Sequence, residues 1–140
     1  CLDLFRTVML AQAQKCFYEK AERDGIKDKL LALIAAECCA LYKEAHLKLT
    51  TSSVLRLRIG RGFQAVVESN AVLFDGLKHY HAAAGHLEAL EYGKQVARLG
   101  QAVDACAQAV EIVQKANISD AVIQRFASSH ARAAESYTKA

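Results

Sequence analysis

The stretch Met9-Leu10-Ala11-Gln12-Ala13-Gln14-Lys15-Cys16-Phe17-Tyr18-Glu19-Lys20-Ala21 decides the fold of this chain. Apolar residues recur in it every three or four positions, which is the spacing of an amphipathic helix directed at a core. Two neighbouring stripes of this kind predict a helix covered on two sides, as in a layered stack of helices. Their members are Leu2, Phe5, Met9, Ala13 and Cys16, with Lys20 as a polar end, and Leu10, Ala13, Phe17 and Ala21.

The rest of the chain continues in the same helical pattern. None of the 140 residues is proline, which favours long uninterrupted helices. We expect helices over about residues 2–23, 27–49 and 54–91, a fourth from the Tyr92-Gly93 turn to about 116, and a fifth over about 120–138. The third has glycines that predict a bend or break near residues 60–62. The predicted fold is all-α, an elongated stack of about five helices with tetratricopeptide-like helical hairpins, although no clean repeat period is present.

The second and fourth helices carry apolar stripes of their own. In the second helix the apolar band is wide, so we expect one side to be buried and another side still to be covered. Its members are Leu30, Ile34, Cys38, Leu41 and Ala45, extended by Leu31, Ala35, Cys39 and Tyr42. The stripe of the fourth helix consists of Val96, Leu99, Val103, Cys106, Val110 and Val113.

Composition narrows the class of protein. Hydrophobic residues make up 53% and charged residues 24%, which excludes a disordered chain. The net charge of +3 is mild; it favours acidic partners but does not argue for nucleic acid. The five cysteines form an odd set without a Cys-x-x-Cys motif, and those inside helices are placed like small core residues. We therefore predict reduced thiols, no disulfide and a cytoplasmic location.

The motifs of common enzymes and metal sites are missing. The sequence has no His-Glu-x-x-His, phosphate-binding loop or Gly-x-Ser-x-Gly elbow. His79 and His81 lie two apart and point to different faces of a helix, so we interpret them as helix-surface histidines and not as metal ligands. The sequence therefore predicts no catalytic residue, no metal, no cofactor and no small-molecule substrate.

One arginine cluster, Arg56, Arg58 and Arg61, stands near the expected break. A solvated basic face is the favoured interpretation, and contact with phosphate or anionic lipid is the alternative. Binding of single-stranded nucleic acid would need stacking aromatics beside the cluster, and only Phe63 is near.

Three blocks of sequence resemble a known family. "MLAQAQKCFYEKA" (9–21), followed by "KDKLLALIAAECCALYKEA" (27–45) and later by "HYHAAAGHLEALEYGKQVARL" (79–99), is similar to the BRO domain of the ALIX family of endosomal-sorting adaptors. The first block is specific and the others are supporting. The resemblance covers essentially the whole chain but only the C-terminal half of that domain. It therefore implies that residues 1–140 are a fragment without the N-terminal half.

The resemblance implies a function and a site. It implies a cytoplasmic adaptor, recruited to endosomes and peripheral to their membrane, that acts in sorting to multivesicular bodies. In that family a patch on the concave face receives the C-terminal amphipathic helix of an ESCRT-III filament subunit. The family's hydrophobic contact residues transfer onto Phe17, Leu30 and Ile34. Leu33 stands where relatives can carry a lysine, and Lys20 would steer an acidic partner helix, as would Lys15, Lys27 and Lys29.

Two alternatives stay open. BRO domains also occur in rhophilin-like and phosphatase-like signalling proteins, where the module would serve a different partner. The third interpretation is a structural helical bundle without a binding surface. From the residues alone, core packing is the favoured role for Phe17, Leu30 and Ile34, and the resemblance reverses that preference. An apolar patch on the surface at Phe17 and Ile34 would separate the first two interpretations from the third.

Overall fold

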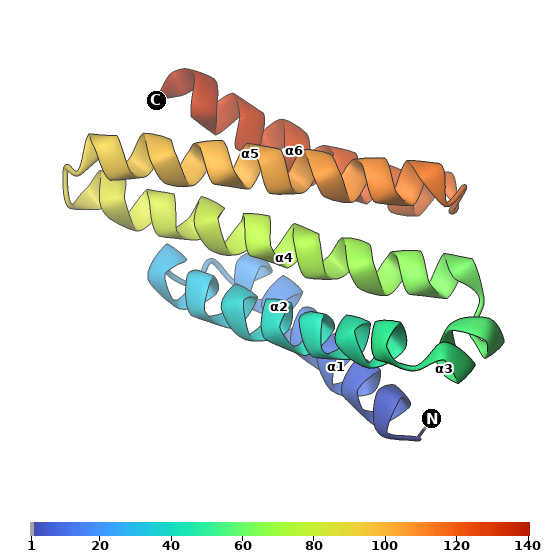
Figure 1. The fold of residues 1–140 in the computed structure, drawn as a ribbon. Coiled ribbons are helices and arrows are strands. Elements are labelled where there is room, and N and C mark those ends of the chain that lie inside the picture. Colours follow the sequence, from blue (N-terminus) through green and yellow to red (C-terminus); the bar gives the residue numbers. More distant parts are fainter. Residues whose placement is uncertain (1) are drawn as a thin grey trace.

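A computed structural model of the chain describes residues 2–140, and Cys1 lies outside the described residues. Those residues form helices joined by short turns, and no strand is present among them (Figure 1). This confirms the predicted all-α stack. The helices are α1 (Leu2–Arg23), α2 (Asp28–Thr51), α3 (Ser53–Arg58), α4 (Arg61–Glu88), α5 (Tyr92–Lys115) and α6 (Asp120–Lys139).

Three of the long helices end in the same way. The residues Gly25, Leu90 and Asn117 have positive φ angles of 73°, 60° and 53°. In each case the next residue donates its backbone N–H to a carbonyl five positions earlier, as in Glu91 to His86 at 2.8 Å. This is the Schellman motif, which satisfies carbonyls left free at a helix end. The turn predicted at Tyr92-Gly93 is therefore wrong by a few residues, because Leu90 takes the left-handed position and Tyr92 already begins α5.

The predicted break near residues 60–62 is confirmed, and it divides the expected third helix into α3 and α4. Ile59 and Gly60 are extended, with ψ angles of 129° and 144°. The Gln64 side chain donates to the carbonyl oxygens of Ile59 at 2.7 Å and of Arg56 at 3.0 Å. Gln64, in the first turn of α4, thus supplies hydrogen bonds to backbone carbonyls that the break between the helices would otherwise leave unpaired.

The long helices form two layers. Successive helices run antiparallel, so α1, α4 and α6 point one way while α2 and α5 point the other; α1 lies behind α2, and α6 behind α5 (Figure 1). Helix α2 is covered on two sides. The Cys38 thiol faces the carbonyl of Ala11 in α1 at 3.8 Å, and the Cys39 thiol faces that of Ala71 in α4 at 3.4 Å. The rear face of the molecule is consequently built from α1, α4 and α6.

Small residues bring α4 and α5 close together. A Cβ atom added at Gly76 would lie 3.0 Å from the Ala105 Cβ and 3.1 Å from the Cys106 Sγ. The stripe predicted for α5 is partly right, because Leu99, Cys106 and Val113 are buried while Val103 and Val110 are only partly buried and Val96 is exposed. Alanines fill the remaining core positions of α5: Ala102, Ala105 and Ala109.

The two stripes of residues predicted to form the buried faces of α1 are wrong. Leu2, Phe5, Met9, Leu10, Cys16 and Phe17 are exposed, although Ala21 is buried. The buried side chains lie on a different face of the helix: Leu4, Thr7, Val8, Ala11, Tyr18 and Ala21. Apolar residues surround most of this helix, so their spacing alone does not select the face that α2 and α4 cover. Tyr18 can be buried because its hydroxyl finds a partner.

The stripe predicted for α2 is rotated by about one position. Leu31, Ala35 and Tyr42 form the centre of the buried face, while Leu30 is half exposed. The predicted wide apolar band is nevertheless present, since α1 and α4 cover two flanks and a further apolar flank is left at the surface.

Candidate protein-interaction surfaces

The α1–α2 hairpin carries an apolar surface that we call the outer patch: Phe17, Leu30, Leu33 and Ile34. The first three are 56%, 50% and 63% exposed, whereas Ile34 is partly buried and packs against the core. A single apolar side chain of this size contributes up to about 1.5–3 kcal/mol when it is fully buried, so a molecule that covered these three would gain part of that free energy from each.

Local geometry places these side chains together. The Gln14 side chain donates to the backbone carbonyl of Ile34 at 3.5 Å, which fixes this flank of α1 against α2. Phe17 stands three residues after Gln14, and Leu30 four residues before Ile34, so each pair shares a helix face. The structure therefore brings the predicted Phe17, Leu30 and Ile34 to one side of the hairpin.

The predicted charged rim is only partly assembled there. Lys20 is exposed on α1, and Lys27 and Lys29 are exposed at the start of α2. Lys15, in contrast, faces the other flank of α1, where its ammonium donates to the Asn70 side-chain oxygen at 3.2 Å. Lys15 is therefore not part of the rim of the outer patch, because its ammonium group is directed at α4.

A chain of buried polar contacts joins the α1–α2 hairpin to α4. The Tyr18 hydroxyl lies 2.6 Å from the His81 Nε2, and the His81 Nδ1 lies 2.8 Å from the Asp28 carboxylate. A neutral imidazole satisfies both contacts by accepting from Tyr18 and donating to Asp28. Burial lowers the pKa of His81, against the opposing effect of Asp28, and burial raises the pKa of Tyr18.

The hydrogen-bonded contacts of Tyr18, His81 and Asp28 connect α1, α4 and the first residue of α2. The prediction of a helix-surface histidine is therefore wrong for His81, which is only 3% exposed. Sequence reasoning missed all three residues, because Tyr18 and Asp28 stand 63 and 53 residues from His81 and form no local motif.

An open cleft of about 910 Å³ lies on the opposite flank of α1, between α1 and α6. Helix α4 forms its floor, and the ion pair between Arg132 and Glu22 bridges the two walls. The Arg132 guanidinium also lies 5.1 Å from the centre of the Tyr80 ring. The cleft shares no residue with the outer patch. We call it the rear cleft; its charged lining residues are Lys15, Glu19, Glu22, Arg23, Arg125 and Arg132.

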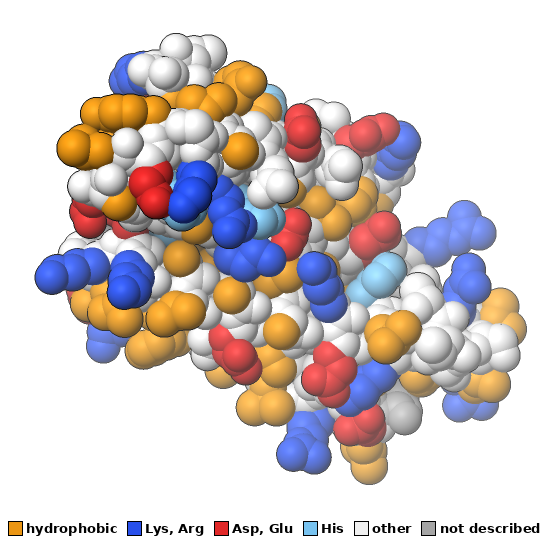
Figure 2. Space-filling view, turned by 60° about the vertical axis from the view of Figure 1, so that its left-hand side comes forward, with side chains coloured by type: hydrophobic (Ala, Val, Ile, Leu, Met, Phe, Trp, Pro, Cys, Tyr) orange, Lys and Arg blue, Asp and Glu red, His pale blue; other side chains and the backbone are white. Residues whose placement is uncertain are grey.

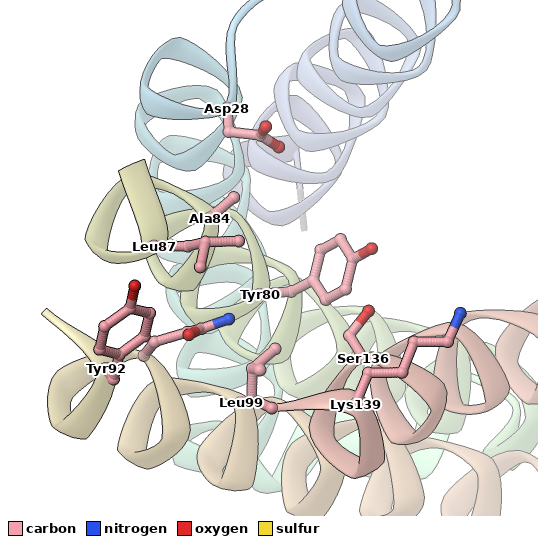
Figure 3. A pocket seen from close by; sticks show the side chains of 10 residues that line it. Asp28, Tyr80, Ala84, Leu87, Tyr92, Leu99, Ser136 and Lys139 are labelled. Atoms are coloured by element: carbon pink, nitrogen blue, oxygen red, sulfur yellow. The ribbon is translucent and has the colours of Figure 1, made fainter. Parts of the chain in front are cut away.

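A smaller pocket of about 420 Å³ opens near the α4–α5 turn. Figure 3 shows Ala84, Leu87 and Leu99 in its middle, with the Tyr80 and Tyr92 rings to either side. Hydrophobic side chains lie in several separate areas of the face that Figure 2 shows, and a group of Lys and Arg side chains lies beside a histidine near its centre.

The remaining sequence predictions concern charge and metals. Arg56, Arg58 and Arg61 are exposed, in agreement with a solvated basic face. Among residues 2–140, no cluster of three His, Cys, Asp or Glu side chains is arranged to hold a metal ion. Within the same residues, none of the helices has the length and hydropathy needed to span a bilayer.

Fold and surfaces together describe a stack of helices with an exposed apolar patch and an open cleft lined by charged side chains. The sequence model of the BRO1-like domain family matches residues 1–140, and the chain belongs to this family. The family resemblance inferred from the three sequence blocks is thereby confirmed. BRO1-like domains are protein-interaction modules.

Curated relatives share about a third of the residues. "ALG-2 interacting protein X" of Dictyostelium discoideum is 33% identical over 140 residues, which cover 99% of this chain and 18% of the relative. "pH-response regulator protein palA/prr-1" of Neurospora crassa is 29% identical, covering 88% of this chain and 14% of the relative. "Tyrosine-protein phosphatase non-receptor type 23" of Mus musculus is 32% identical, and the match covers 90% of this chain and 8% of the relative. The chain spans less than a fifth of the length of these relatives.

Proposed function

We propose that the chain is part of an endosomal-sorting adaptor and that its outer patch binds the C-terminal amphipathic helix of an ESCRT-III filament subunit. The observation that carries the proposal is the exposure of Phe17, Leu30 and Leu33 on one side of the α1–α2 hairpin. Membership of the BRO1-like family supports it, since the resemblance implies contact residues at Phe17, Leu30 and Ile34.

The partner would bind as a helix in a groove. An amphipathic helix presents apolar residues at three- and four-residue spacing, and Leu30, Leu33 and Ile34 offer the complementary spacing on α2. Phe17 supplies an aromatic anchor from α1. The exposed ammonium groups of Lys20, Lys27 and Lys29 would raise the association rate of an acidic helix more than its final affinity. Recruitment to endosomes from the cytoplasm, peripheral to the membrane, is part of this proposal.

A second candidate has one observation in its favour. A relative named as a tyrosine-protein phosphatase matches this chain about as well as the ALG-2 interacting protein does. The same patch would then serve a BRO-type scaffold in a signalling protein, with a partner other than an ESCRT-III subunit.

The test is a titration of fluorescently labelled ESCRT-III C-terminal peptides into the full-length protein, with two leucine variants. Leu33 in the patch and Leu47 outside it lie on the same helix and are 63% and 60% exposed. They stand fourteen residues apart, which is about 21 Å along the helix. Leu33→Asp should weaken binding at least about tenfold, because it places a carboxylate against the partner's apolar face. Leu47→Asp should leave the affinity within about twofold.

Each outcome separates the interpretations. No peptide binding by the wild-type protein would favour the scaffold with a different partner. Binding that Leu33→Asp leaves unchanged, with circular dichroism showing a folded variant, would contradict the outer patch as the site. Equal losses in Leu33→Asp and Leu47→Asp would also contradict it.

A further inference from the structure

We propose that the rear cleft is a second protein-binding surface, which takes a short acidic segment with an apolar stripe from another polypeptide. The cleft lies on the opposite flank of α1 from the outer patch and shares no residue with it. This proposal therefore does not rest on the ESCRT-III partner assigned above.

The floor of the cleft is a line of side chains along α4. Val66, Asn70, Leu73 and Leu77 follow one another at three- and four-residue steps, with Phe74 beside Leu73. Their side chains therefore form a single line along α4. From Val66 to Leu77 this line is about 16 Å long, at about 1.5 Å per residue, which matches three turns of helix. The walls are parallel helices, α1 on one side and α6 on the other. Val66 is partly exposed and the other four floor residues are at most 6% exposed, so apolar contact in the cleft comes from Val66 and from the partly exposed Val122 of α6.

The charge of the walls selects an acidic occupant. Four basic and two acidic side chains line the cleft, and the Arg132–Glu22 ion pair neutralises one of each. Three basic groups and one acidic group, Glu19, are left. Within residues 2–140, Lys15, Arg23 and Arg125 have no carboxylate within ion-pair distance. Lys15 contacts only the neutral amide of Asn70, at 3.2 Å.

Shape and charge together favour a peptide over a compact anion. A phosphate or lipid headgroup would use the cations but not the partly exposed apolar side chains of Val66 and Val122. An acidic amphipathic segment would use both, with its apolar stripe against these two valines and its carboxylates beside Arg23 and Arg125.

The experiment is a selection of random 16-residue peptides displayed on phage, with the full-length protein as the target. Enriched peptides are then synthesised, and their affinities are measured for the wild type and four variants. Arg125→Glu reverses a charge in the cleft, and Ser128→Trp fills the cleft without changing charge. Arg58→Glu is the matched control, because it reverses an exposed arginine outside the cleft. Leu33→Asp reports on the outer patch.

We expect one class of enriched peptides to be rich in Asp and Glu, with apolar residues every three or four positions. Arg125→Glu and Ser128→Trp should each weaken this class at least about tenfold, whereas Arg58→Glu and Leu33→Asp should change its affinity by less than about twofold. Circular dichroism checks that each variant is folded, and two independent cleft variants keep the test valid if one is not.

Several results would overturn the proposal. One is the absence of any peptide class that responds to Arg125→Glu or Ser128→Trp. Another is an equal loss in Arg58→Glu, which would show an effect of net charge alone. A third is binding to phosphatidylserine vesicles that Arg125→Glu abolishes in a protein that selects no acidic peptide, since the cleft would then be a membrane contact.

Discussion

The α4–α5 hairpin and the α1–α2 hairpin place their exposed apolar side chains differently. Between α4 and α5, Gly76 and the alanines of α5 let the helices approach closely, and the exposed large apolar side chains lie near the turn, at Leu87, Leu90 and Tyr92. In α1 and α2, larger apolar residues such as Phe17 and Leu33 are left at the surface. The comparison teaches that apolar content does not measure burial: small residues form the tight interface, and several large ones are exposed at the proposed binding surface.

The largest expected effect compares two phenylalanines. Phe74 is 1% exposed, with the rings of Tyr18 and Tyr42 centred 5.3 and 6.1 Å away, whereas Phe17 is 56% exposed. Phe74→Ala should lower the free energy of unfolding by about 3–5 kcal/mol, because it leaves a cavity. Phe17→Ala should lower it by less than about 1 kcal/mol, since water already reaches that ring.

Urea denaturation of the full-length protein gives both values. If Phe17→Ala destabilised the fold as much as Phe74→Ala, Phe17 would be a core residue and the two hairpins would not differ as described.

The next effect tests the close approach of α4 and α5. Gly76→Ala places a methyl group 3.0–3.2 Å from Ala105, Cys106 and the backbone oxygen of Ala102. It should cost about 1–3 kcal/mol, because none of these atoms is the free end of a flexible side chain. Gly85 lies in the same helix with no atom near its Cβ position. Gly85→Ala should therefore stabilise the protein by about 0.5–1 kcal/mol, as alanine does within a helix.

Opposite changes in the thermal midpoints of the two glycine variants are the expected result. If Gly76→Ala and Gly85→Ala both stabilised the protein, the α4–α5 interface would have space for a methyl group at position 76.

A smaller effect is the pH dependence of stability that comes from His81 of α4, which contacts Tyr18 and Asp28 of the α1–α2 hairpin. Because burial lowers the pKa of His81, the unfolded chain binds a proton near pH 6.5 that the folded protein does not. The contribution of His81 to stability is then complete above about pH 6.5 and declines as the pH falls below it. The wild type should thus lose more stability between about pH 7.5 and 5.5 than His81→Gln does. His79, whose pKa is also lowered, is common to both proteins.

The measurement is the urea midpoint of each protein at the two pH values. Identical losses in the wild type and His81→Gln would show that His81 accepts a proton in the folded state as easily as in the unfolded one.

The smallest expected effect is a difference in thiol reactivity between an exposed cysteine of α1 and the buried cysteines, and it leaves the stability of the protein unchanged. Cys16 is exposed on α1, while Cys38, Cys39 and Cys106 are buried. Burial raises the pKa of Cys38 to about 12 and that of Cys106 to about 11, which suppresses the reactive thiolate. Cys16 should react quickly with a disulfide reagent in the folded protein, and Cys16→Ser should remove one fast-reacting thiol per chain. Rapid reaction of Cys106 would contradict a sealed α4–α5 interface.

The sequence predicts the helices better than their faces. Gly25, Asn117, the glycines near residue 60 and the absence of proline locate most helix ends, because capping depends on local chemistry. Leu90, at the end of α4, has no such signal. The buried face of α1 could not be predicted in this way. Phe5, Met9 and Phe17 are as apolar as the side chains that enter the core, and only the positions of α2 and α4 decide between them. Cys16, placed by spacing in the core, is exposed for the same reason.

The candidate sites depend even more on tertiary structure. Positions 17, 30 and 34 followed from a family resemblance, and spacing alone favoured the core for them. The rear cleft and the Tyr18–His81–Asp28 chain had no sequence signal, since their residues come from helices far apart in the chain. The neighbouring Phe17 and Tyr18 show the difference: one residue along a helix separates an exposed ring from a ring that is 3% exposed.

The most direct measurement of the central claim, that the outer patch receives a partner helix, is methyl NMR during a titration. Leucine and isoleucine methyl groups of the full-length protein are labelled, and an unlabelled ESCRT-III C-terminal peptide is added. We expect the signals of Leu30, Leu33 and Ile34 to shift as binding saturates, while those of Leu47 and Leu57, which are also exposed, stay in place. Shifts confined to Leu73 and Leu77 in the rear cleft, or absent from Leu30 and Leu33, would contradict the claim.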